Sequence, residues 1–274
     1  MIIAVFSDVH GKILPCFKLC ERWEKENDEK IDLILQTGDL GIFPNPERLD
    51  SATKRHARND EEELGFYYNF YQKQKRAENV LKKLGCNLVF VRGNHEDHDF
   101  LDSLEVEHEG VIFPVDVYNR IFCLKSGLVY TFRKGSEEIR ILGIGRISER
   151  AKRKPDKKYI QEYERHRILS QKEGFDILLT HDSAKDFVTK GFGAKEIRFV
   201  LEKFKPVYHF YGHTGEEFNV KHFGSTIVVK VSDLKWEKSD TGSVLKKGCM
   251  AIMHWEDRKM HSLEVADIYW SRKY

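Results

Sequence analysis

The sequence lacks the features of a disulfide-rich, zinc-ribbon or membrane-spanning protein. Its five cysteines form an odd set without a CxxC pair, so we expect reduced and buried thiols. No segment approaches the ~18 consecutive apolar residues of a membrane helix, and MIIAVFSDVHG has no basic region before its short apolar run. We therefore expect a cytoplasmic protein with no membrane partner.

A strong charge excess is also missing. The 46 Lys and Arg residues are balanced by 44 Asp and Glu residues, and a formal net charge of +2 does not by itself indicate a nucleic-acid partner. The chain shows no internal repeat and no low-complexity tract. Because single α/β domains commonly reach ~250 residues, 274 residues predict one domain that spans 1–274.

Short apolar runs that each end in a polar cluster recur along the chain. They are IIAVF, IDLILQ, NLVFV, FDILL and PVYHFY. Continuous rather than alternating apolar character predicts strands that are buried on both faces. GKILPCFKLCERWEKE, between the first two runs, repeats apolar residues at intervals of three or four, as an amphipathic helix does. The alternation of strand and helix predicts an α/β fold.

Two regions depart from this rhythm. Residues at about 44–84 are expected to form an insertion, whose LGFYYNFYQKQKRAENVLKKLG predicts one helix ending at Gly85. Its aromatic residues Phe66, Tyr67, Phe70 and Tyr71 share one face and favour core packing over base stacking. From about residue 218 the chain predicts further strands, and IFCLKSGLVYTFRKGSEEIRILGIG predicts strands with a turn at residues 135 and 136.

Residue types that bind metals follow the predicted strands. In chain order they are Asp8-x-His10, Gly38-Asp39, Gly93-Asn94-His95-Glu96, His181 and Gly212-His213. Ligands of open α/β folds gather at the carboxyl ends of the strands, so these clusters predict one site. A carboxylate such as Asp39 can bridge two cations, and mixed N and O donors suit Mn, Fe or Zn. Two cations ~4 Å apart clamp a phosphate and activate a water.

The motifs SDVHG, GDLG, GNHE, THD and GHT together resemble the calcineurin-like metallophosphoesterases, with matches from Asp8 to His213. The resemblance implies a four-layer αββα sandwich of two mixed β-sheets flanked by helices. It also implies a dinuclear metal phosphoesterase that hydrolyses a phosphodiester or phosphomonoester by metal-bound hydroxide. The implied cofactors are two divalent ions, Mn²⁺ in the first place, with Fe, Zn, Ni or Mg as alternatives.

The resemblance also implies roles for individual residues. Asp8 and His10 would bind the first metal, Asp39 would bridge, and the second metal would be bound by Asn94, His181 and His213. His95 would be the catalytic residue that contacts the scissile phosphate and protonates or stabilises the leaving group. An acid such as Glu96 or Asp97 would orient its ring.

Within this family the chain is most similar to the RNA lariat debranching branch. The segments FYYNFYQKQK, IRILGIGRIS, THDSAKDF and LEKFKPVYHFYGHTGEEF carry the similarity in order and spacing, from about residue 66 to 218. It implies a phosphate ester of a nucleotide or nucleic acid as substrate. The chain departs from the branch at Asp8, where cysteine is usual, and at Gly215, where the family has a second histidine that binds the first metal.

Gly215 leaves three interpretations open. The first metal is held weakly by Asp8, His10 and Asp39 in an enzyme that remains active, because three protein ligands still make a catalytic site. Alternatively, a nearby side chain replaces the histidine, namely Glu216, Glu217 or His222. In the third interpretation the chain is a degenerate member that binds nucleotide or RNA with little turnover. A protein serine/threonine phosphatase fits less well, because the arginine motif of that branch is not recognised here.

A basic segment lies between two of the motifs. Residues 150–167, RAKRKPDKKYIQEYERHR, carry a net charge of +5 and begin a few residues after LGIGR. Such a run is able to follow a phosphodiester backbone, with tyrosines available for base stacking. We therefore predict substrate contacts for Arg146, Lys152 and Arg153, and single-stranded nucleic acid or a nucleotide as partner. A solvated basic loop is the equal alternative.

Overall fold

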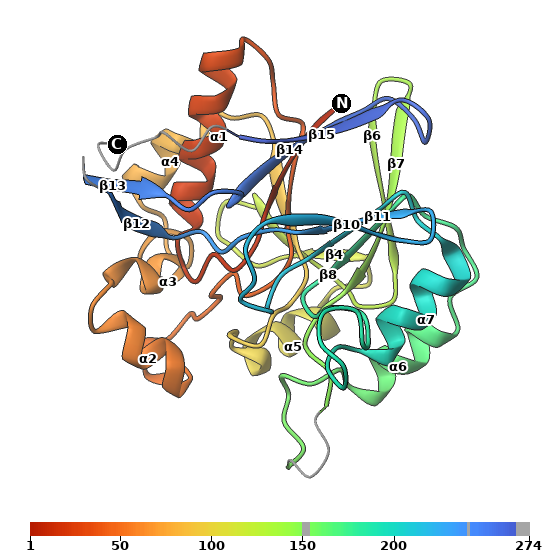
Figure 1. The fold of residues 1–274 in the computed structure, drawn as a ribbon. Coiled ribbons are helices and arrows are strands. Elements are labelled where there is room, and N and C mark those ends of the chain that lie inside the picture. Colours follow the sequence, from red (N-terminus) through yellow and green to blue (C-terminus); the bar gives the residue numbers. More distant parts are fainter. Residues whose placement is uncertain (150–153, 240–241, 267–274) are drawn as a thin grey trace.

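Two mixed β-sheets lie at the centre of the computed structural model, which describes residues 1–149, 154–239 and 242–266 (Figure 1). The first sheet has the order β15 (His261–Val265), β14 (Met250–Trp255), β1 (Ile2–Phe6), β2 (Leu33–Gln36), β3 (Asn87–Phe90), β5 (Ile121–Leu124) and β4 (Ile112–Pro114). The second has the order β10 (Asn219–Phe223), β11 (Thr226–Lys230), β9 (Tyr208–Tyr211), β8 (Ile177–Thr180), β7 (Glu137–Ile144) and β6 (Val129–Lys134). A separate ribbon pairs β12 (Trp236–Ser239) with β13 (Gly242–Leu245).

The inner faces of the two sheets pack against each other. Alternate side chains such as Val5 and Leu35 of the first sheet meet Ile141, Leu179 and Phe210 of the second in one buried cluster. The remaining side chains of the same strands point outward and are covered by helices. Burial on both faces explains why these strands read as continuous apolar runs.

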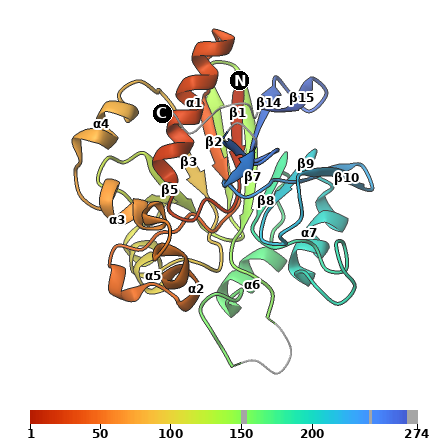
Figure 2. The same ribbon diagram turned by 60° about the vertical axis from the view of Figure 1, so that its left-hand side comes forward.

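Helices form the outer two layers (Figure 2). The first sheet is covered by α1 (Ile13–Asn27), α3 (Gly65–Asn69), α4 (Lys75–Leu81) and α5 (His98–Glu107). The second sheet is covered by α6 (Glu162–Leu169) and α7 (Lys195–Phe204). This arrangement confirms the predicted αββα sandwich, and α1 confirms the helix expected after the first strand.

The predicted single helix of the insertion is wrong in its middle. The chain leaves the helix after Asn69 and enters the next one only at Lys75. In the gap, the hydroxyl of Tyr118 accepts a hydrogen bond from the backbone N–H of Gln74. A contact with a distant residue therefore overrides local helix propensity. The insertion also contains the short elements η1 (Pro46–Arg48), α2 (Ser51–Ala57) and η2 (Glu61–Leu64).

Several smaller expectations are tested by the same structure. All five cysteines are free and buried, as predicted. Phe66 and Phe70 pack in the core, but Tyr71 is 41% exposed, so the aromatic face is only partly a core face. Among the described residues no helix is both long enough and apolar enough to cross a membrane.

The strand order brings the predicted ligands to one place. Strands β1, β2 and β3 run parallel to one another in the first sheet, and β7, β8 and β9 do so in the second. Each of the polar motifs follows the carboxyl end of one of these strands. The motifs therefore meet at a common edge of the sandwich.

Candidate metal centre

Two groups of three potential metal ligands share one carboxylate. The ligand atoms of Asp8, His10 and Asp39 lie within 4.8 Å of one another, as do those of Asp39, His181 and His213. One oxygen of Asp39, Oδ2, lies 4.0 Å from His10 Nε2, and the other, Oδ1, lies 3.4 Å from His181 Nε2. The two oxygens thus face different histidines, as a carboxylate that bridges two cations requires.

Asn94 joins the second group. Its side-chain oxygen lies 3.0 Å from His181 Nε2. The other ring nitrogen of His181, Nδ1, lies 3.0 Å from the carbonyl oxygen of Thr37. A carbonyl only accepts hydrogen bonds, so Nδ1 carries the proton and Nε2 is available to a metal. The donor set of carboxylate, imidazole and amide oxygen fits Mn²⁺, Fe or Zn²⁺ and does not resemble a thiolate site.

Glycine is required at two positions of the motifs, because neighbouring atoms leave no room for a Cβ atom there. A Cβ atom at Gly93 would lie 2.0 Å from both the backbone nitrogen and Oδ1 of Asp39. A Cβ atom at Gly212 would lie 2.2 Å from Ser7 Oγ and 2.5 Å from Asp8 Oδ2. Any side chain at either position would displace a predicted ligand, which explains why glycine precedes Asn94 and His213.

Four of the predicted ligands have a left-handed backbone. The φ angles are 43° at Asp8, 47° at His10, 54° at Asp39 and 62° at His213. Residues other than glycine rarely adopt such angles, and those that do cluster at functional sites where the surroundings hold them. Here the N–H of His10 donates to the carbonyl oxygen of Asp39 at 2.8 Å. The strained turns aim the ligand side chains at one another.

The electrostatics of the site favour positive charge. Burial raises the pKa of Asp39, but the neighbouring imidazoles of His181, His10 and His95 outweigh it and hold that pKa well below its usual range. Burial lowers the pKa of His181, but the charge of Asp39 and its hydrogen bond raise it to about 9. Carboxylates that stabilise a protonated imidazole in this way also attract a divalent cation.

His95 has a partner that the sequence did not reveal. Its ring nitrogen Nδ1 lies 3.0 Å from Oδ2 of Asp50, which precedes α2 and caps it through the backbone N–H groups of Ala52 and Thr53. Burial lowers the pKa of His95, but the Asp50 hydrogen bond and the charge of Asp39 raise it to about 9. The ring centre of His95 lies 5.6 Å from that of His10, so the oriented imidazole stands beside the first ligand group.

The expectation that Glu96 or Asp97 orients His95 is wrong. The Glu96 carboxylate accepts hydrogen bonds from four backbone N–H groups, those of residues 40, 41, 42 and 93. Asp97 caps α5 and pairs with Arg48 at 2.6 Å. Asp50 lies 45 residues from His95, inside the insertion. The local sequence around Asp50 indicates only a helix N-cap, and an N-cap does not predict a contact with a catalytic histidine.

None of the three proposed replacements for the missing histidine joins the ligand groups of the described residues. Glu216 is within hydrogen-bond distance of the hydroxyls of Tyr211 and Thr214, at 3.3 and 3.4 Å. Glu217 and His222 are exposed to solvent. The first ligand group therefore consists of the three side chains Asp8, His10 and Asp39. A Cβ atom at Gly215 would meet no atom within 4 Å, so this position borders open space.

Replacing Gly215 with histidine is expected to strengthen Mn²⁺ binding at the weaker site by on the order of tenfold, because it adds a donor where space exists. Isothermal titration calorimetry of the metal-free protein measures the two binding steps. The φ angle of 70° at this position makes any side chain strained. Gly215→Ala carries the same strain without a ligand and is the matched control. Equal Mn²⁺ affinity in the two variants would contradict the prediction.

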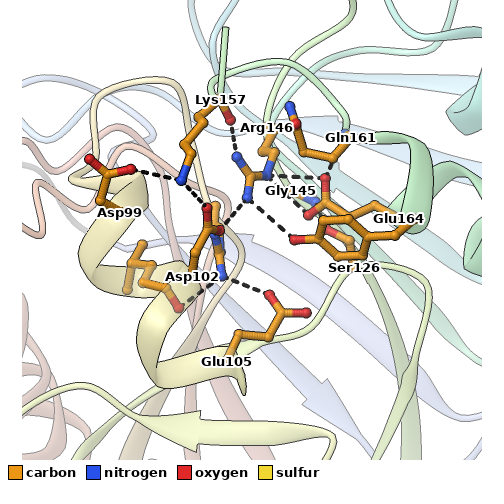
Figure 3. Close-up of polar contacts among 12 residues, drawn as sticks. Asp99, Asp102, Glu105, Ser126, Gly145, Arg146, Lys157, Gln161 and Glu164 are labelled. Carbon is orange, nitrogen blue, oxygen red and sulfur yellow. Dashed lines mark hydrogen bonds and ion pairs between the residues drawn. The ribbon is translucent and has the colours of Figure 1, made fainter. Parts of the chain in front are cut away.

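Arg146 is placed differently from the sequence expectation. Its side chain is fully buried, with Nε 3.0 Å from Glu164 and Nη2 2.8 Å from Asp102 (Figure 3). Lys157 joins the same network, 2.7 Å from Asp99 and 3.0 Å from Asp102. Because its guanidinium is enclosed by protein carboxylates, Arg146 is not accessible for the substrate contact predicted for it.

The remainder of the basic segment is described only in part. Lys152 and Arg153 lie outside the described residues, so their predicted substrate contacts stay predictions. Tyr159 is buried, whereas Tyr163 is 43% exposed and has the guanidinium of Arg167 5.0 Å from its ring centre. Arg146, which precedes the segment, pairs with Asp102 of α5 and Glu164 of α6, and Lys157 within the segment pairs with Asp102 (Figure 3).

Replacing Arg146 with methionine is expected to lower the free energy of unfolding by about 3–5 kcal/mol, since Glu164 would keep a buried and unpaired charge. Urea denaturation followed by circular dichroism measures the change. Lys154→Met, at an exposed position in the same segment, is the control and is expected to stay within about 0.5 kcal/mol. Unchanged stability together with a raised KM would instead indicate that Arg146 contacts the substrate.

Two cavities flank the ligand groups. One, of about 610 Å³, is lined by Asp8, His10 and His95 together with residues of α2 and of the β12–β13 ribbon. The other, of about 700 Å³, is lined by His213 and by the loop that follows β8, including Phe192. The candidate centre therefore opens on two sides, and each cavity is in the size range of small-ligand sites.

Comparisons with known proteins agree with this geometry. Lariat debranching enzyme of Arabidopsis thaliana is 24% identical over 248 residues, which cover 78% of this chain and 54% of the relative. The chain thus spans about half the length of that curated relative.

Solved structures share the fold. One crystal structure with 12% identity has a TM-score of 0.57 over 96% of this chain and 97% of the other. GAP50, the anchor in the inner membrane complex of Plasmodium, has 9% identity and a TM-score of 0.50 over 92% of this chain and 80% of its own. Residues 1–217 match the family described as calcineurin-like phosphoesterase, so the chain belongs to the calcineurin-like phosphoesterase family.

Proposed function

We propose that this protein hydrolyses a phosphodiester of a nucleotide or nucleic acid at a centre of two divalent ions, with Mn²⁺ as the preferred ion. Membership of the family implies metal-dependent hydrolysis of a phosphoester. The observation that carries the dinuclear proposal is the position of Asp39, whose two oxygens face histidines of two separate ligand groups.

The residues of the site would have separate roles in metal binding and proton transfer. Asp8, His10 and Asp39 would hold one ion, and Asp39, Asn94, His181 and His213 would hold the other. When bound, the ions supply Lewis acidity and lower the pKa of a water. The imidazole of His95 lies next to the first ligand group and is oriented by Asp50 at 3.0 Å. His95 donates a proton to the leaving oxygen, and Asp50 stabilises its charged form.

Three observations support a nucleotide or nucleic-acid diester. The chain is similar to an enzyme described as a lariat debranching enzyme. The exposed lysines at positions 235 and 238 line the cavity beside His95 and suit an anionic substrate. A phosphodiester carries two ester groups, and cavities on both sides of the ligand groups offer each of them a place.

The proposal is tested with protein freed of metal and then titrated with MnCl₂. Bis-p-nitrophenyl phosphate and p-nitrophenyl phosphate are the substrates, and mass spectrometry counts the metal ions per chain. We expect two Mn²⁺ ions per chain, activity that appears with the metal, and a higher kcat/KM for the diester. Activity no greater than that of the Asp39→Asn variant would contradict the proposal.

A second candidate function follows from Gly215. With three protein ligands in the first group, the protein would bind a nucleotide or RNA and turn it over slowly. Binding of a fluorescein-labelled oligonucleotide, measured by anisotropy at millimolar Mn²⁺, together with the absence of its cleavage would favour this alternative. Cleavage of the same oligonucleotide would exclude it.

A further inference from the structure

We propose that the cavity beside His213 binds the base of a nucleoside attached to the retained side of the phosphate, with Phe192 as its stacking surface. The inference rests on the proposed phosphodiesterase function and adds the position of one substrate group to it. The cavity has a volume of about 700 Å³, which a base and its ribose are able to enter, and His213 forms part of its wall.

Phe192 offers an aromatic ring at the wall of this cavity. Its side chain is 51% exposed although it is large and apolar. Val188 and Ile147 line the same cavity, Ser183 and Thr189 add hydroxyl groups, and Glu149, Asp182 and Lys185 add charged groups. A wall that combines apolar and aromatic side chains with polar groups that fix orientation is typical of a site for a flat heterocycle. Every base has a π-face, so stacking on Phe192 would tolerate different bases.

The loop that carries Phe192 is held by its own hydrogen bonds. Ala184 and Ala194 form an isolated β-bridge that closes the loop. The backbone N–H of Asp186 donates to the carbonyl oxygen of Phe192 at 2.8 Å, and the N–H of Phe192 donates to Thr189 at 3.0 Å. The loop begins two residues after His181. Phe192 is therefore fixed relative to a predicted metal ligand, and little order has to be gained when a base binds.

The position of His95 decides which arm of the substrate this cavity receives. His95 lines the cavity of about 610 Å³ with His10, whereas His213 lines the cavity of Phe192. A leaving oxygen that takes its proton from His95 departs toward the His95 side. In an in-line displacement the attacking oxygen lies opposite the leaving oxygen, so the ester group that stays on phosphorus is equatorial. That group is free to extend away from His95 into the cavity that Phe192 lines.

Two diesters with the same leaving group test the inference. Thymidine 5′-(p-nitrophenyl phosphate) carries a base on the retained arm, and methyl p-nitrophenyl phosphate carries only a methyl group there. Hydrolysis of the first forms one P–O bond from water and breaks the bond to the nitrophenyl oxygen, giving p-nitrophenol and thymidine 5′-phosphate. Phe192→Ala is expected to raise KM for the thymidine ester about tenfold. For the methyl ester, KM is expected to change less than about twofold.

Matched variants and a binding measurement complete the experiment. Phe192→Tyr keeps an aromatic ring and is expected to retain the wild-type KM. Phe199→Ala removes an aromatic residue on α7 that is 36% exposed and lines neither cavity, and it is expected to change nothing. Calorimetric titration with thymidine 5′-phosphate is expected to show about tenfold weaker binding for Phe192→Ala.

The outcomes separate the inference from the proposed function. Absence of Mn²⁺-dependent hydrolysis of both esters would overturn the phosphodiesterase proposal, and the calorimetric comparison would then decide the base site by itself. Hydrolysis of both esters with equal KM changes in Phe192→Ala, or with none, would overturn the base site and leave the phosphodiesterase intact.

Discussion

The Asp39→Asn variant is expected to lose Mn²⁺-dependent activity on bis-p-nitrophenyl phosphate by on the order of 10³-fold or more. The carboxylate of Asp39 serves both ligand groups, with one oxygen toward His10 and the other toward His181. Asparagine is nearly isosteric but has a single oxygen, and its amide group would point hydrogens at one of the two ions. Loss of the charge that both sites share and of the ligand oxygen of one site removes several kcal/mol of transition-state stabilisation.

Metal content distinguishes this cause from misfolding. We expect fewer than two Mn²⁺ ions per chain in Asp39→Asn, with an unchanged circular dichroism spectrum. Asp233→Asn is the matched control, because Asp233 lines the cavity beside His10 and His95 but pairs with Lys246 and belongs to neither ligand group. Its activity is expected to stay within about threefold of wild type. Two tightly bound ions in Asp39→Asn would refute the bridging role.

The second large effect concerns His95. His95→Ala is expected to lower kcat by about 10²–10⁴-fold for a dinucleotide such as thymidylyl-(3′→5′)-thymidine, whose leaving group is an alkoxide that needs a proton. The loss is expected to be smaller for bis-p-nitrophenyl phosphate, because nitrophenolate leaves readily without one. Metal content should not change, since His95 belongs to neither ligand group. Equal losses with the two substrates would contradict the role of proton donor.

Asp50 extends this test to a positioning residue. Asp50→Asn keeps an oxygen to cap α2 but removes the charge that orients and stabilises the His95 imidazole. Alone it is expected to lower kcat for the dinucleotide about tenfold, again more than for the nitrophenyl ester. In a His95→Ala background it is expected to have no further effect, because the two residues act as a unit. Additive losses would show that Asp50 acts independently of His95.

The sequence was informative wherever a local pattern has one structural meaning. The strands that carry the ligands are recognisable because burial on both faces demands unbroken apolar runs such as residues 2–6 and 33–36. Glycines at 93 and 212 precede two of the predicted ligands in the sequence, and the structure shows the contacts that forbid a side chain there. The helix expected across 65–84 failed, because Tyr118 holds the chain between α3 and α4 in a non-helical path.

In the candidate site, too, local patterns predicted some features correctly and failed for others. The six predicted ligands were identified from motifs at strand ends, and parallel strand order brings them to one edge. The partner of His95 was assigned to its neighbours in sequence, yet Glu96 and Asp97 are used by backbone N–H groups and Arg48. Arg146 was expected at the substrate because it lies just before the basic segment, but carboxylates from α5 and α6 enclose it.

Residue types and their spacing along the chain were thus sufficient for the family, the strands that carry the ligands, and the residues able to bind metal, because these depend on periodicity and on motifs a few residues long. Tertiary structure alone decided that Asp50 faces His95, that no described residue replaces the histidine absent at position 215, and that two cavities open beside the centre. These features depend on contacts between residues far apart in the chain, which local patterns do not encode.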